Sequence, residues 1–189
     1  MLIDVHANQV LSRAGLTGLT YYPQHPGSRM HPDTARFLAT VGLPSNKLFS
    51  AKLDLHAHRR LECQPSLKAA FDADGATLPK DASHWEIIGE FQYAMVVLDP
   101  RTGKVYSFAE GEEFHVPMHQ DVSSLAHALT CVETGLADLK KLPHAEDRAR
   151  EEVIERLRNT IDQADDTPLA SVDSVWSKFF DEISFGMWG

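Results

Sequence analysis

The stretch Trp85-Glu-Ile-Ile-Gly-Glu-Phe-Gln-Tyr-Ala-Met-Val-Val-Leu-Asp-Pro-Arg-Thr-Gly-Lys-Val-Tyr-Ser-Phe108 decides the fold of this chain. Within it, the apolar run Ala94–Leu98 precedes Asp99-Pro-Arg-Thr-Gly103, where proline and glycine stand at positions typical of a tight turn. The continuous apolar run indicates a central strand buried on both faces. The short turn makes the next strand antiparallel. The predicted strands span Trp85–Phe91, Tyr93–Asp99 and Lys104–Phe108.

An edge strand and a helix are predicted next. Phe114–Pro117 suits only an edge strand, because proline cannot donate a ladder hydrogen bond. Asp121 or Ser123 can cap a helix that runs to about Glu133, with Gly135 near its end.

Two more helices are predicted in the C-terminal part of the chain. One is strongly charged and spans residues 146–163. The other starts at Ser171 or Asp173 and stops at Gly186. Their apolar stripes consist of Val153, Ile154, Leu157 and Ile161 in the first helix, and Val175, Trp176, Phe179, Phe180 and Ile183 in the second.

The N-terminal part of the chain gives fewer signals. Asp33 can cap a short helix over residues 34–41, and Gly42 suits the left-handed residue that ends it. A strand is predicted over Leu48–Leu55, and residues 72–84 have the composition of a loop. Helices at both ends of an antiparallel or mixed sheet predict an α+β domain.

Composition restricts the class of protein. A chain of 189 residues suits one domain with additional helices. The two cysteines, Cys63 and Cys131, form no Cys-x-x-Cys pair, and we expect both to be free thiols. The first residues have no basic segment typical of a secretory signal, and no apolar run approaches the ~20 residues that cross a bilayer. We therefore expect a soluble, cytoplasmic protein.

The net charge of −9 indicates what kind of partner is possible. It disfavours binding to nucleic acid and to an anionic membrane, and it attracts a basic protein. Between Glu86 and His115 there are six acids and two bases. Such a group could imitate a phosphate backbone, or it could be an ordinary solvated face. The candidate partner-binding residues are Glu86, Glu90, Glu110, Glu112 and Glu113.

No pattern of catalytic or metal-binding residues is convincing. His56 and His58 share a face only if extended, and no third ligand is evident. His115 and His119 have the spacing of a helical zinc pair, but Pro117 stands between them. Walker, dinucleotide, nucleophile-elbow and His-Glu-x-x-His motifs are absent from the sequence. We predict a binding protein without catalytic residues, cofactor or metal; the alternative is a metal-dependent hydrolase that uses His56, His58 and another histidine.

Several short segments together resemble the SUKH superfamily (SMI1/KNR4-like proteins), and its SUKH-4 branch in particular. They are Ala35-Arg-Phe-Leu-Ala-Thr-Val-Gly-Leu-Pro44, Ile88-Gly89, Val97-Leu-Asp-Pro-Arg-Thr-Gly-Lys-Val105, Ser123-Ser-Leu125 and the helix that begins with Val175-Trp176. The resemblance covers about two-thirds of the chain.

The resemblance implies a fold and a function. It implies a single SUKH-4-like domain over residues 1–189, with a core at about 33–135 and a C-terminal helical part at about 145–186. It implies an immunity protein of a bacterial polymorphic toxin system, which neutralises a nuclease- or deaminase-type toxin by direct binding. The alternative is a non-enzymatic regulatory or scaffold protein of the SMI1/KNR4 type.

Overall fold

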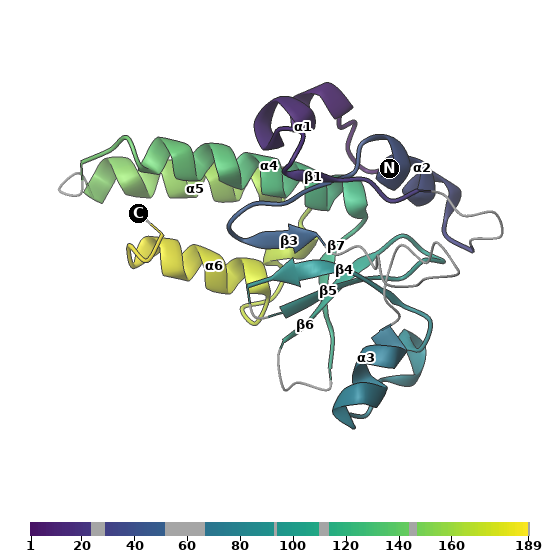
Figure 1. The fold of residues 1–189 in the computed structure, drawn as a ribbon. Coiled ribbons are helices and arrows are strands. Elements are labelled where there is room, and N and C mark those ends of the chain that lie inside the picture. Colours follow the sequence, from purple (N-terminus) through teal and green to yellow (C-terminus); the bar gives the residue numbers. More distant parts are fainter. Residues whose placement is uncertain (24–28, 52–66, 93, 110–113, 144–146, 189) are drawn as a thin grey trace.

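The fold is built around a five-stranded antiparallel sheet with the strand order β3-β4-β5-β6-β7 (Figure 1). This computed structural model describes residues 1–23, 29–51, 67–92, 94–109, 114–143 and 147–188. The strands are β3 (Phe49–Ala51), β4 (Glu86–Phe91), β5 (Ala94–Leu98), β6 (Val105–Ala109) and β7 (Val116–His119). The prediction that the apolar run forms a central strand is confirmed, since β5 lies between β4 and β6.

Helices cover both faces of the sheet, and the fold is α+β as predicted. The helices are α1 (Ala7–Ala14), α2 (Pro32–Thr40), α3 (Leu67–Asp74), α4 (Val122–Leu139), α5 (Asp147–Ala164) and α6 (Val175–Ser184). Short 3-10 helices, η1 (Lys80–Ala82) and η2 (Thr167–Leu169), and a small sheet of β1 (Leu19–Thr20) and β2 (Leu43–Pro44) complete the described elements. Figure 1 shows α4, α5 and α6 on one side of the sheet and α3 on the other.

The larger hydrophobic core lies between the sheet and helices α2, α4 and α6. Phe91 of β4 contacts Trp176 and Phe179 of α6, with ring centroids 4.8 and 6.2 Å apart. The predicted apolar stripe of the last helix is fully confirmed, because Val175, Trp176, Phe179, Phe180 and Ile183 are all buried. These aromatic contacts fix α6 against the sheet.

A smaller core lies on the opposite face. Phe71 of α3 packs edge-on against Phe108, and Trp85 stacks on Tyr106 with ring centroids 4.2 Å apart. Leu67, Ile87 and Val97 are buried in the same cluster. The second face of the sheet is therefore closed by α3 at the Trp85 end of β4.

The turn between β5 and β6 forms as its sequence predicts. The Asp99 carboxylate accepts hydrogen bonds from the Arg101 amide at 3.0 Å and from Thr102 Oγ1 at 2.7 Å. Gly103 has φ +78°, and a Cβ there would lie 2.6 Å from Thr34 Oγ1. Glycine is needed both for its backbone conformation and for the close approach of α2.

Some predicted boundaries were wrong. Helix α1 was not predicted, and α3 and η1 occupy parts of the predicted loop over residues 72–84. Asp33 lies inside the first turn of α2, since Pro32 is already helical and His31 is the N-cap residue. Gly135 does not end α4 but lies within it, where a Cβ would come 2.8 Å from Leu157 of α5. Close packing between α4 and α5 explains this glycine.

Candidate functional site

The five predicted contact residues do not form one array among the described residues. Glu86 and Glu90 lie in β4, whereas Glu110, Glu112 and Glu113 lie outside the described residues. Glu86 is opposite Leu98, and Glu90 is opposite Met95, with a register shift between Ile87 and Gly89. Directly paired residues share a face. Leu98 belongs to the larger core and Met95 packs against the smaller one, so Glu86 and Glu90 point to opposite faces.

Glu90 lies at the end of the sheet where β4 turns into β5. It is exposed. Strand β6 ends at the same place, because Ala109 pairs with Ala94, and Ala94 pairs with Phe91. Ala109 is also the last described residue before Glu110. Glu90 and Ala109 therefore lie at the same end of the sheet.

A small groove lies at this end, between the β4–β5 hairpin and the end of α6. Gln92, with φ +53°, donates from Nε2 to Glu182 Oε2 at 3.1 Å. Trp188 Nε1 donates to the same oxygen at 2.8 Å. The groove has a volume of about 360 Å³ and is lined by Lys47, Gln92, Glu182, Met187 and Trp188. Two donors thus fix the Glu182 carboxylate at the mouth of an amphipathic groove.

Large apolar side chains are exposed beside this groove. Phe185 is 83% exposed and Met187 is 70% exposed, at the turn that ends α6. Trp188 is anchored against Phe179, with ring centroids 5.6 Å apart. We call the group formed by Gln92, Glu182, Phe185, Met187 and Trp188 the hairpin-end surface; Glu90 lies at the same end of the sheet but points to the face opposite α6. Sequence reasoning missed its apolar members, although two large apolar residues flanking the predicted helix stop Gly186 were a usable signal.

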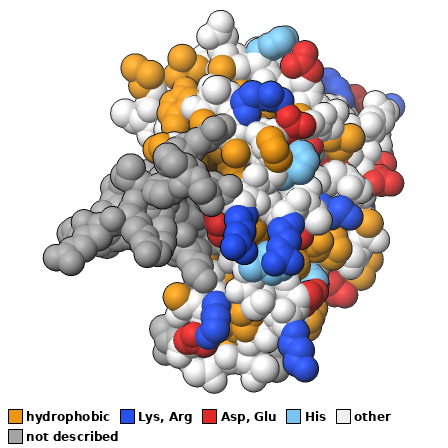
Figure 2. Space-filling model, turned by 90° about the vertical axis from the view of Figure 1, so that its right-hand side faces the viewer, with side chains coloured by type: hydrophobic (Ala, Val, Ile, Leu, Met, Phe, Trp, Pro, Cys, Tyr) orange, Lys and Arg blue, Asp and Glu red, His pale blue; other side chains and the backbone are white. Residues whose placement is uncertain are grey.

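The opposite end of the sheet carries positive charge. Arg101 and Lys104, both exposed, lie in and next to the β5–β6 turn. Figure 2 views the molecule from this side and shows Lys and Arg side chains in the middle of the face, with Asp and Glu side chains beside and around them. Two exposed cations therefore lie in and next to the β5–β6 turn, at the end of the sheet opposite Glu90.

A second polar group is buried between β7, α4, η2 and α6. Trp176 Nε1 donates to His119 Nε2 at 2.9 Å, and His119 Nδ1 lies 2.8 Å from Ser124 Oγ and 3.4 Å from an Asp165 oxygen. Ser124 Oγ also donates to Asp165. The Asp165 carboxylate accepts two backbone amides as well, from Gln120 at 2.9 Å and Thr167 at 3.0 Å. Every one of these polar groups therefore has a partner.

These residue types match a Ser-His-Asp triad, but their hydrogen bonds do not. Indole N–H can only donate, so His119 Nε2 must accept and the ring proton is on Nδ1. Ser124 gives its own proton to Asp165, so no base is available to activate it as a nucleophile. Burial lowers the pKa of His119, and the ring is neutral at pH 7. The group joins four elements and has no access to a substrate.

The Asp165 carboxylate is held ionised inside the protein. Burial raises its pKa, but hydrogen bonds from His119, Ser124 and the Gln120 and Thr167 amides together bring the pKa well below its usual range. A buried anion that accepts this many bonds stabilises the fold only while all its donors are present.

The predicted histidine pair does not converge. His119 lies in the larger core, while His115 packs edge-on against Trp85 on the other face of the sheet, with ring centroids 4.8 Å apart. His56 and His58 lie outside the described residues. Within the described part of the chain, no group of three or more His, Cys, Asp or Glu residues is placed to hold a metal.

One cysteine is described, and it is a free thiol. Cys131 Sγ lies 3.4 Å from His127 Nε2, one turn earlier on α4. Burial raises the pKa of the Cys131 thiol, which leaves little thiolate at neutral pH. Cys63 lies outside the described residues.

Comparison with protein families decides the relationship. A model of the SUKH-4 immunity protein family matches residues 6–182, nearly the whole chain. The chain belongs to the SUKH-4 immunity protein family. Comparisons with curated proteins and with solved structures gave no match. Membership of SUKH-4 implies a cognate toxin as the partner. It also fits the hydrogen bonds of Ser124 and His119, which leave neither side chain able to act as a nucleophile or a base.

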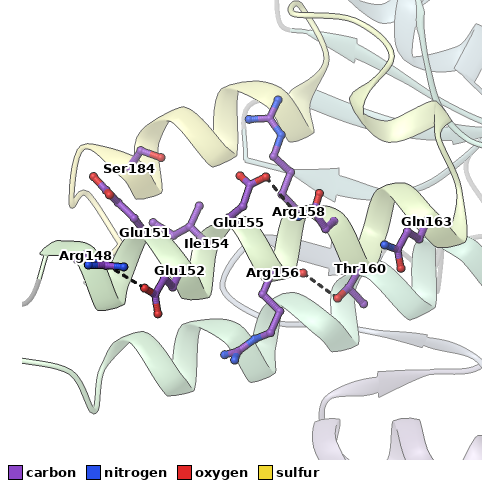
Figure 3. A pocket seen from close by; sticks show the side chains of 11 residues that line it. Arg148, Glu151, Glu152, Ile154, Glu155, Arg156, Arg158, Thr160, Gln163 and Ser184 are labelled. Carbon is purple, nitrogen blue, oxygen red and sulfur yellow. Dashed lines mark hydrogen bonds and ion pairs between the residues drawn. The ribbon is translucent and has the colours of Figure 1, made fainter.

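The SUKH-4 protein also has a broad furrow along α5, which Figure 3 shows next to α6. Its volume is about 880 Å³. Arginines and glutamates alternate along it, and some pair within the helix, as Arg148 does with Glu152 at 3.2 Å. Such i, i+4 pairs stabilise an exposed helix. Alternating charge gives this furrow no net field for a ligand.

None of the described helices of this SUKH-4 protein is both long enough and apolar enough to cross a bilayer.

Proposed function

We propose that this protein neutralises a basic, nuclease- or deaminase-type toxin by direct binding at the hairpin-end surface. The bound immunity protein excludes the nucleic-acid substrate from the toxin's active site and performs no chemistry itself. The observation that carries the proposal is the pairing of exposed apolar side chains, Phe185 and Met187, with the fixed carboxylate of Glu182 at one end of the sheet. The encounter is proposed to take place in the cytoplasm, where such a toxin finds its substrate.

The apolar side chains supply the affinity in this proposal. Phe185 and Met187 each expose most of their surface, and their burial would remove apolar area from water at about 25 cal/mol per Å². Binding energy in protein interfaces concentrates in a few such central anchors. Gln92 and Trp188 hold Glu182 in place before the partner arrives, which lowers the ordering cost on binding.

Acidic residues supply attraction and specificity. A net charge of −9 draws a basic toxin toward the protein, and the positive β5–β6 turn orients it away from that end. We propose Glu90, Glu110, Glu112 and Glu113 as contacts with the toxin. The prediction for Glu86, which points to the face opposite that of Glu90, stays a prediction, and the experiment below includes it.

Charge reversal tests this proposal against the toxin encoded by the neighbouring gene. Titration calorimetry at low and moderate salt compares wild type with Glu90→Lys, Glu86→Lys and the matched control Glu151→Lys, which reverses an exposed charge on α5. We expect Glu90→Lys to weaken binding at least about tenfold and to reduce the salt dependence. Glu151→Lys should change the affinity less than about threefold.

Equal effects of Glu90→Lys and Glu151→Lys would contradict a specific acidic contact. Absence of any toxin among captured proteins, with several cellular proteins bound instead, would favour the regulatory or scaffold function. Retained toxin inhibition with no complex formed would overturn the binding mechanism itself.

A further inference from the structure

A groove between α1, α4 and α5 is unrelated to the hairpin-end surface. Its volume is about 490 Å³, within the range of about 300–1,000 Å³ typical of small-molecule sites. Most of the residues that line it have polar or charged side chains. The ones that carry the argument below are Arg13, His127, Cys131, Asp138 and Arg156. The two surfaces have no lining residue in common.

Two arginines line this groove without an ion pair to any described residue. Among the described residues, neither Arg13 in the last turn of α1 nor Arg156 of α5 makes an ion pair or a side-chain hydrogen bond. Figure 3 shows Arg156 projecting toward α4, away from α6. Both arginines act on the same carboxylate, Asp138, whose pKa is lowered mainly by Lys141 and further by Arg156 and Arg13. Two guanidinium groups thus line the same groove in a protein whose net charge is negative.

The acid at the groove is already neutralised. Asp138 Oδ1 accepts a hydrogen bond from Lys141 Nζ at 2.9 Å. The lining threonines are also occupied as donors, since Thr130, Thr134 and Thr160 each donate to the carbonyl four residues earlier. The charged donors left for a ligand are the two guanidinium groups, which suit phosphate and carboxylate oxygens bidentately.

Less polar walls lie below these donors. Val153 and Leu157 line the groove from α5, and the lack of a side chain at Gly135 lets α4 approach Leu157 closely. His127 is half-buried, with Nε2 3.4 Å from Cys131 Sγ. A ligand seated here would meet cations at one side and aliphatic groups and an imidazole ring at the other.

We propose that this groove binds a small organic phosphate, with Arg13 and Arg156 on the phosphate and His127, Val153 and Leu157 against the organic part. The volume exceeds what a bare phosphate fills, and the apolar wall gives the organic part a surface to bury. The proposal does not depend on the toxin, because the groove lies away from the hairpin-end surface.

The thiol of Cys131 reports directly on occupancy. The full-length protein is alkylated with iodoacetamide at mildly alkaline pH, and mass spectrometry of peptides measures the rate at Cys131. Adenosine monophosphate is the probe, with adenosine and inorganic phosphate as comparison ligands. We expect saturating adenosine monophosphate to slow alkylation of Cys131 at least about fivefold, as expected for a site closed by its ligand. The peptide that contains Cys63 serves as the internal reference.

Matched variants assign the effect to the arginines. Protection should be lost in the double variant Arg13→Gln/Arg156→Gln and kept in Arg158→Gln, which removes an exposed arginine of α5 outside this groove. Denaturant unfolding checks that the double variant remains folded. Protection unchanged in the double variant, protection by adenosine alone, or none by adenosine monophosphate would overturn the proposal. Equal protection by inorganic phosphate would overturn the organic part of it.

Discussion

Two polar regions of this molecule contain similar residue types and serve different ends. The buried group around His119 and Asp165 satisfies every polar atom within the protein, whereas the hairpin-end surface holds Glu182 with two donors beside exposed apolar side chains. A completely paired interior group contributes to folding and is unreactive. An ordered carboxylate next to exposed Phe185 and Met187 has interaction capacity left for a partner. In this account, hydrogen-bond completeness, and not residue type, separates the structural group from the proposed contact surface.

The largest expected effect is the loss of the buried carboxylate. Asp165→Ala leaves the Gln120 and Thr167 amides and the Ser124 hydroxyl without an acceptor. We expect the free energy of unfolding to fall by about 3–5 kcal/mol, as for other broken buried networks. Urea denaturation measures it. The neighbouring exposed residue supplies the control, since Asp166→Ala should cost less than about 0.5 kcal/mol. Similar losses in both variants would mean that the buried network is unimportant.

A smaller effect is expected from removing one donor of the same group. Trp176→Phe keeps an aromatic ring but leaves His119 Nε2 without its hydrogen bond. We expect a loss of about 1–3 kcal/mol in the free energy of unfolding, with toxin affinity unchanged at temperatures where the variant is folded. Trp188→Phe is the comparison variant at the hairpin-end surface. It should show the reverse pattern, with little loss of stability and weaker toxin binding.

Acid should weaken the buried group specifically. Burial lowers the pKa of His119 below its unfolded value, so its neutral form is favoured in the folded state. The unfolded chain therefore binds more protons below pH ~6.5, and stability present above that pH is lost as the pH falls. Asp165, whose pKa is also lowered, adds a further loss in more acidic solution. We expect up to about 1.4 kcal/mol per pH unit from His119, measured as urea midpoints from pH 7.5 to 5. A flat profile would contradict a buried neutral His119.

The smallest effect on stability is expected at the hairpin-end surface. Phe185→Ser/Met187→Ser should change the free energy of unfolding by less than about 0.5 kcal/mol, because both side chains are largely exposed. The same variant should weaken toxin binding more than about tenfold in calorimetry. Val172→Ser removes another exposed apolar side chain elsewhere and should leave the affinity unchanged. Equal weakening by Val172→Ser would indicate a general effect of surface hydrophobicity.

The sequence predicted the elements that depend on neighbouring residues. The turn at Asp99–Gly103 and the apolar stripe of α6 follow from local spacing, and both formed as expected. The prediction of an α+β sheet rested on the same local signals. Asp121 was one of two caps proposed for α4, and it accepts the Ser123 and Ser124 amides.

Features that depend on distant contacts could not be predicted. Trp176 and His119 are 57 residues apart in the sequence, and Ser124 and Asp165 are 41 apart. No pattern of neighbouring residues could therefore predict these hydrogen bonds. Gly135 was interpreted as lying near the end of the helix, because the residues next to it in the sequence do not indicate that α5 packs against it. The acidic residues of β4 were grouped by position in the chain, but the register shift at Ile87 and Gly89 places Glu86 and Glu90 on opposite faces.

Hydrogen exchange of the protein alone and in complex with the neighbouring gene's toxin tests the central claim most directly. The account predicts that toxin binding protects backbone amides of the β4–β5 hairpin and of the turn after α6, which includes Phe185 and Met187. Amides of α5 should exchange at the same rate in both states. Unchanged exchange at the hairpin and the α6 turn, with protection confined to α5 or to the β5–β6 turn, would contradict it.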